Sequence, residues 1–208
     1  MQSWGQWIEA RSHIAAKLKG ADRQNAEAYF LKLHAASEAY FRRMMFVGLR
    51  LKLVSYDNAN RWLHNNDSTP DKDKFPKKFN KLYEPTFSFE AILDECPNGN
   101  ILWGLWLDFA KPMRNHLAHG IRQYTADWLE CGIRINQGLL IELDGVMAKH
   151  FGNSIVADLT KLKPRLPQGR KDMDIPALLG TKQSSPKRFV TLKAAKDSLI
   201  SAGWYPLE

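Results

Sequence analysis

The residues best suited to chemistry are crowded into one stretch, KPMRNHLAHG, which lies between apolar segments in a tryptophan-rich region. Within six positions it holds Arg114, Asn115, His116 and His119. His116 and His119 are three residues apart, so on a helix they could ligate a metal ion together, but a complete site needs three or four ligands. The other interpretation is structural: Pro112 begins a helix whose first polar side chains face water. The residues alone leave both interpretations open.

The string RNHLAHG resembles the signature of the HEPN superfamily, in which an arginine and a polar residue precede a histidine on an all-α bundle. The matching residues are Arg114, Asn115 and His119, with four residues between the arginine and the histidine. The resemblance covers about residues 24–150. It assigns no subfamily, because the compact two-gene toxins have a tyrosine two places after the histidine, where this chain has Ile121.

The resemblance implies a metal-independent endoribonuclease, a toxin or antiphage defence effector, that needs no cofactor and is active as a dimer. Cleavage of RNA by its own 2′-hydroxyl requires a base, an acid and a cation for the charge on the phosphorane. Imidazoles titrate near neutral pH, so proton transfer falls to His119. The planar guanidinium of Arg114 would clamp the phosphate oxygens.

Helical geometry relates the three residues of this motif. At 3.6 residues per turn, Arg114 and His119 lie about 140° apart, whereas Asn115 and His119 share a face. Asn115 is therefore expected to orient the imidazole or to bind phosphate beside it, while Arg114 reaches in on its longer side chain. Because each chain offers one motif histidine, a two-fold homodimer would supply both the acid and the base. His116 is the auxiliary candidate for the second group.

Outside this stretch the sequence has no glycine-rich phosphate loop, no nucleophile elbow and no HExxH zinc helix. The acidic pairs Asp94/Glu95 and Glu142/Asp144 are expected to be ordinary surface charges on helices. Isolated histidines are common at helix surfaces and ends, which is where we expect the following ones: His13, His34, His64 and His150.

The charge distribution favours a polyanionic partner. The chain has 30 Lys and Arg against 22 Asp and Glu, for a net charge of +8. Residues 160–208 contain 10 basic and 4 acidic residues, whereas residues 1–159 contain 20 and 18. A basic region of this kind suits RNA or an acidic protein. We expect phosphate contacts from these side chains: Lys161, Lys163, Arg165, Arg170, Lys171, Lys187 and Arg188.

Composition is that of an ordinary globular protein. Of the 208 residues 44% are hydrophobic and 25% charged, enough for the core of one domain with a small appendage. No apolar stretch approaches a bilayer span and the first residues lack the apolar run of a secretory signal, so we expect no membrane partner. Cys96 and Cys131 form neither a disulfide framework nor a zinc set, which predicts a location in the reducing cytoplasm.

Apolar residues recur every three or four positions along most of the chain, which predicts helices nearly throughout. Pro112 is expected to interrupt or restart a helix that begins at Asn100, and the nearby Trp103 and Trp106 are expected in the core. Residues 66–86, rich in Pro, Lys and Asp, are expected to form an exposed loop. The other helices are expected over about 4–19, 24–54, 59–64, 88–95, 125–149 and 190–202.

These elements predict an all-α fold: a four-helix up-down bundle, HEPN-like by resemblance, with a basic C-terminal extension. The bundle is expected over 1–159 and the extension, which ends in a helix, over 160–208. The expected partners are RNA, a second copy of the chain and a cognate antitoxin or regulatory protein. The alternative function is a non-catalytic helical subunit that binds nucleic acid or a partner within a defence or toxin–antitoxin system.

Overall fold

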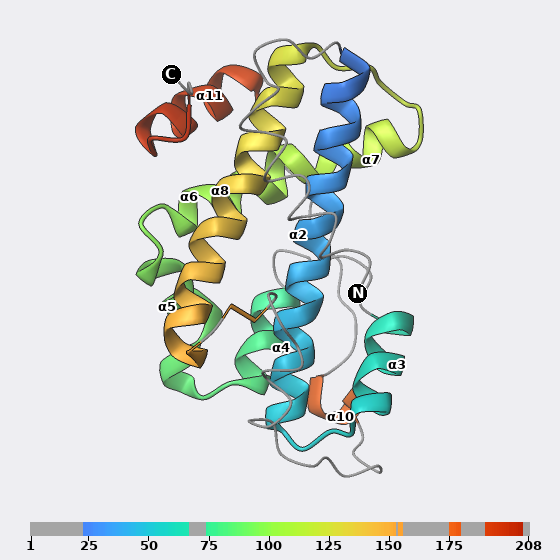
Figure 1. Ribbon diagram of the computed structural model, residues 1–208, viewed down its shortest axis with the longest axis vertical. Coiled ribbons are helices and arrows are strands. Elements are labelled where there is room, and N and C mark those ends of the chain that lie inside the picture. Colours follow the sequence, from blue (N-terminus) through green and yellow to red (C-terminus); the bar gives the residue numbers. More distant parts are fainter. Residues whose placement is uncertain (1–22, 67–73, 153, 156–174, 180–189, 206–208) are drawn as a thin grey trace. The chain divides into compact units, whose positions relative to one another are not determined.

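The computed structural model describes residues 23–66, 74–152, 154–155, 175–179 and 190–205, and these residues are predominantly helical (Figure 1). None of them belongs to a β-strand, which confirms the predicted all-α class. No helix in these ranges is both long and apolar enough to cross a bilayer. The expected helix over 4–19 lies outside the described residues. The elements are α2 (Arg23–Leu51), α3 (Tyr56–Asn66), α4 (Lys74–Leu82), the 3-10 turn η1 (Pro85–Phe87), α5 (Phe89–Glu95), α6 (Gly99–Leu105), the π-helical turn η2 (Trp106–Ala110), α7 (Lys111–Ala118), α8 (Ala126–Phe151), α10 (Ile175–Leu179) and α11 (Leu192–Ser201).

The chain divides into two compact units. Unit 1 comprises residues 1–37, 96–143 and 187–208, and unit 2 comprises residues 38–95 and 144–186. The two longest helices, α2 and α8, contribute one part to each unit. The expected boundary at residue 160 lies outside the described residues and stays a prediction.

In unit 1 the first half of α2 lies beside α8 (Figure 1). Phe30 and Leu33 are buried on α2, as their three-residue spacing predicts, and Trp103 and Trp106 are buried as expected. Gly132 on α8 makes the close approach feasible, because a Cβ there would lie 2.6 Å from the Phe30 ring.

The helix that begins at Gly99 is not interrupted at Pro112, because the π-helical turn η2 precedes that residue. In η2 the Lys111 N–H donates to the Trp106 carbonyl, five residues back. Pro112 has no N–H to give to the Asp108 carbonyl one turn earlier. The Val190 N–H donates to this carbonyl instead, at 2.9 Å. The proline is therefore accommodated by a wider turn and by a donor from the C-terminal segment.

The C-terminal helix α11 packs within unit 1 and contacts α6. The Thr191 side chain caps its first turn, and Leu199 is fully buried. The Glu142 carboxylate, expected as an ordinary surface charge, instead accepts hydrogen bonds from the Asn98 backbone N–H at 2.8 Å and from Trp204 Nε1 at 3.1 Å. It therefore ties the start of α6 and the end of α11 to α8.

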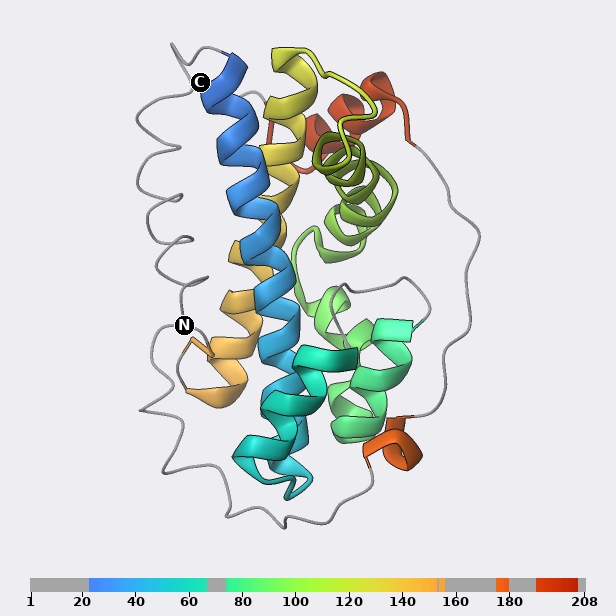
Figure 2. The same ribbon diagram turned by 90° about the vertical axis from the view of Figure 1, so that its right-hand side faces the viewer.

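In unit 2 the expectation of an exposed loop over 66–86 is wrong for Lys74–Leu82, which form α4 (Figure 2). Further along, Pro85–Phe87 form the turn η1, which has no buried side chain. Phe75, Phe79 and Leu82 follow the i, i+4, i+7 spacing of a helix and are buried. Pro76 lies in the first turn of α4, where a proline is tolerated because that N–H has no helical acceptor. The stretch is a short amphipathic helix, and the prediction of a loop gave too much weight to its proline and lysines.

The buried face of α4 packs on the second half of α2. The Tyr83 hydroxyl donates to the Met44 carbonyl at 2.6 Å. A Cβ at Gly48 would lie 2.8 Å from Leu82 Cβ, so the two backbones approach closely there. Leu51 continues the three- and four-residue apolar spacing of α2, which predicts a buried side chain, but it is 39% exposed at the last position of the helix.

Replacing Gly48 with alanine tests this packing. Gly48→Ala should destabilise the protein by about 1–3 kcal/mol, because the added methyl group collides with Leu82 and Tyr83. The matched control is Gly145→Ala on α8, where no atom lies within 4 Å of the added Cβ; it should stabilise by about 0.5–1 kcal/mol. Urea denaturation measures both, and equal effects would contradict the packing of α4 on α2.

Candidate functional site

The motif residues occupy the end of α7, in unit 1. Arg114, Asn115 and His116 lie on this helix, and His119 is its C-terminal cap residue. The helix ends because Gly120 adopts a positive φ of 63°, which lets the Ile121 N–H donate to the His116 carbonyl at 2.8 Å. This pattern is the Schellman motif, for which glycine is favoured. Gly120 therefore determines where the helix stops and where His119 is presented.

The arginine and asparagine of the motif contact each other. Arg114 Nη1 donates to Asn115 Oδ1 at 3.1 Å, and both side chains are half-buried. His119 is exposed, and its backbone N–H donates to the Asn115 carbonyl at 3.1 Å. Asn115 thus lies one turn before His119, as the spacing predicts, but its side-chain oxygen binds the guanidinium. This hydrogen bond restrains the Arg114 side chain.

His116 contacts Tyr124, a residue that the sequence analysis missed. His116 Nδ1 and the Tyr124 hydroxyl are in hydrogen bond at 2.6 Å, and the two ring planes differ by only 4°. Within the described ranges no three His, Cys, Asp or Glu side chains gather as a metal site requires. The contact made by His116 joins α7 to the segment that enters α8.

Aromatic rings continue from Tyr124 into the core of unit 1. Tyr124 packs on Trp128 at 5.2 Å between ring centroids, and Trp128 stacks on Phe109 at 4.9 Å. The Arg122 guanidinium lies 5.1 Å from the Tyr124 ring and 5.3 Å from the Trp128 ring, which suits cation–π attraction. Burial raises the pKa of Tyr124, and the Arg122 charge opposes this shift. The four-residue spacing of Tyr124 and Trp128 is the sequence signal for this cluster.

His34, expected at a helix surface, is fully buried in unit 1, so that expectation is wrong. Its ring stacks on Trp106 at 4.9 Å with an interplanar angle of 4°. Burial is the main cause that lowers its pKa to about 3, and the positive charges of Arg114 and Lys111 contribute to the same shift. His34 is therefore neutral at physiological pH and adds no positive charge near these two cations.

The basic side chains expected to contact phosphate lie outside the described residues; they are Lys161, Lys163, Arg165, Arg170, Lys171, Lys187 and Arg188. Of the other single histidines, His64 is exposed, and His150 pairs with Glu95 at 2.7 Å. Comparison of the chain with protein-family models, with curated proteins and with solved structures found no match.

The buried His34 predicts an acid-sensitive stability. Its pKa is lower in the folded chain than in the unfolded chain, so below pH 6.5 the unfolded state binds the extra proton. The free energy of unfolding therefore decreases as the pH is lowered. Between pH 6.5 and 4.5 this group should cost at most about 1.4 kcal/mol per pH unit. Urea denaturation across this range should show a shallower pH dependence for His34→Phe, which retains a ring against Trp106.

The control for this measurement is His64→Gln, which changes an exposed histidine in unit 2. It should leave the wild-type pH dependence unchanged. Parallel curves for wild type and His34→Phe would show that His34 is protonated alike in the folded and unfolded chains, contrary to its burial.

Proposed function

We propose that this chain is a metal-independent endoribonuclease, a toxin or antiphage effector, with a HEPN-like helical bundle and α7 as its catalytic helix. The observation that carries the proposal is the hydrogen bond from Arg114 to Asn115, one turn before the exposed ring of His119. This arrangement places an oriented guanidinium and an accessible imidazole on the same short helix. They are a phosphate clamp and a proton-transfer group.

In the proposed reaction the 2′-hydroxyl of RNA loses its proton to a motif imidazole and attacks the adjacent phosphorus. The Arg114 guanidinium stabilises the negative charge of the phosphorane. A second imidazole, protonated, gives its proton to the departing 5′-oxygen. The products carry a 2′,3′-cyclic phosphate and a 5′-hydroxyl, because the attacking oxygen belongs to the RNA itself.

Charges within unit 1 support phosphate binding at α7. Lys111 and Arg114 lie on this helix, and both act on the pKa of His34 through their positive charge. Because His34 stays neutral, the two cations are not repelled by a buried third charge. His116, which is engaged with Tyr124, is better placed to hold α7 than to transfer protons.

The proposed mechanism predicts a homodimer. One chain supplies one exposed motif histidine, and a two-fold axis that brings two copies of α7 across a cleft would supply both the base and the acid. Analytical ultracentrifugation at micromolar concentration should therefore detect a dimer. A strict monomer that still cleaves RNA would contradict the two-histidine mechanism.

Substitutions within the motif should separate the roles of its residues. His119→Ala should lower the cleavage rate by about 10²–10⁴ with little change in RNA affinity, since it removes proton transfer. Arg114→Lys keeps the charge and loses the planar fork, so it should retain binding and lose most of the rate. Asn115→Ala should have an intermediate effect, because it releases the guanidinium. Labelled RNA incubated with each variant in EDTA measures the rates.

The controls are His116→Ala, whose effect on the rate should be mild, and an RNA with a 2′-deoxy substitution at the cut site, which should not be cleaved. Cleavage that requires a divalent metal ion and yields 5′-phosphate ends would refute the mechanism. Tight RNA binding without cleavage by the wild-type protein would instead support the alternative, a non-catalytic nucleic-acid-binding subunit.

A further inference from the structure

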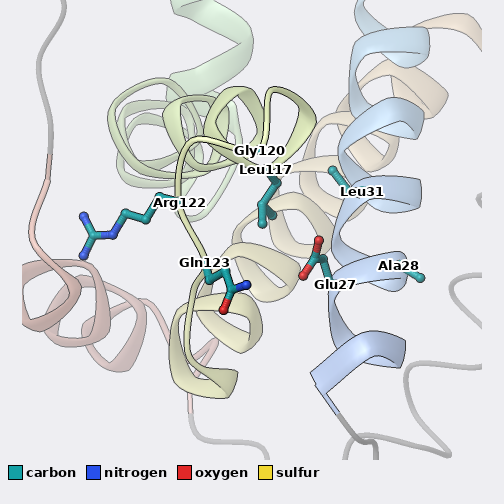
Figure 3. A pocket seen from close by; sticks show the side chains of 7 residues that line it. All are labelled: Glu27, Ala28, Leu31, Leu117, Gly120, Arg122 and Gln123. Carbon is teal, nitrogen blue, oxygen red and sulfur yellow. The ribbon is translucent and has the colours of Figure 1, made fainter.

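A pocket of about 630 Å³ lies beside the motif in unit 1 (Figure 3). One wall is the first half of α2, and the other is the end of α7 with the turn that follows it. On the second wall, Leu117 lies two residues before His119 and Gly120 directly follows it, so this wall lies beside the motif histidine in sequence. The volume is within the range of small-molecule sites, about 300–1,000 Å³.

The pocket combines apolar surface with two polar groups. Leu31 and Leu117 contribute the apolar surface, and the side chains of Glu27 and Gln123 point toward the space between the walls (Figure 3). No hydrogen bond joins either polar side chain to another residue in the described part of the chain. The Arg122 side chain extends away from the others and lies over aromatic rings instead. The polar recognition elements are thus one carboxylate and one amide.

We propose that this pocket binds a guanine base of single-stranded RNA. A carboxylate accepts two parallel hydrogen bonds from two adjacent donors. Guanine is the one RNA base whose Watson–Crick edge has two adjacent donors, the N1–H and the N2 amino group. Adenine and cytosine place an acceptor beside their single amino donor, and uracil flanks its N3–H with two acceptors. For those three bases an acceptor would face the Glu27 carboxylate.

The remaining groups complete the fit to guanine. The Gln123 amide can donate to O6, the acceptor next to N1–H. Leu31 and Leu117 offer apolar contact to the face of the ring, and unpaired RNA bases are commonly recognised by such a combination of ring contacts and edge hydrogen bonds. This inference rests on the proposed function where it concerns cleavage: a guanosine held here would place an adjacent phosphodiester near His119.

Nucleotide binding tests the pocket without any catalytic readout. Isothermal titration of the full chain with GMP, AMP, CMP and UMP should show GMP binding on the order of 10- to 100-fold more tightly than the others. Glu27→Gln should abolish the preference for GMP and favour AMP and CMP, because an amide offers the acceptor and the donor that the edges of adenine and cytosine both require. The matched control is Glu84→Gln, an exposed glutamate in unit 2, which should leave the GMP preference unchanged.

Equal affinities for the four nucleotides, no binding of any, or an unchanged preference in Glu27→Gln would each overturn the proposal. The cleavage pattern separates this outcome from failure of the nuclease proposal. If the protein binds GMP selectively but cleaves no RNA, the result supports the guanine pocket and contradicts the proposed nuclease function. If the wild type and Glu27→Gln both cleave RNA without regard to guanosine, the result supports the nuclease function and contradicts the guanine pocket.

Discussion

The buried amide of Asn136 is the contact on which the arrangement of unit 1 depends. Its Oδ1 accepts from the Ser37 hydroxyl and from Trp106 Nε1, each at 2.9 Å. Its Nδ2 donates to the Gly132 carbonyl at 2.7 Å. One side chain on α8 therefore satisfies polar groups of α2 and η2 in a fully buried setting. Loss of this amide would leave the buried Trp106 N–H without an acceptor, at a cost of about 1–3 kcal/mol, whereas the Ser37 hydroxyl would keep the Leu33 carbonyl at 3.1 Å.

The position of the candidate site follows from that contact. Trp106 begins η2, and the five-residue hydrogen bond of this turn leads directly into α7. The Asp108 carbonyl, which Pro112 cannot serve, is bound by Val190, so the C-terminal segment also holds this turn. At the other end Gly120 stops the helix immediately after His119. The motif is thus presented on a helix whose beginning and end are both determined by specific backbone requirements.

Much of the fold could be predicted from apolar spacing, because the period of a buried helix face is local information. This spacing correctly predicts the helix that carries Phe30 and Leu33 and the helix before Pro112. It also correctly predicts that Phe30, Leu33 and the two tryptophans before Pro112 are buried. The prediction of a loop was wrong for α4, because Pro76 and several lysines were given more weight than the helical spacing of three buried residues. The spacing also predicts a buried side chain at Leu51, which is exposed, because periodicity does not show which part of a helix other elements cover.

For the candidate site, the sequence by itself determined the residue types, their order and the four-residue relation of Asn115 to His119. Only the tertiary structure decided that Asn115 binds the Arg114 guanidinium and that His34 is buried where the charges of Arg114 and Lys111 act on it, because these depend on which side chains meet in space. The pocket likewise had no sequence signal. Glu27 and Gln123 are far apart in sequence, and only the packing of α2 against the turn after α7 places both in one cavity.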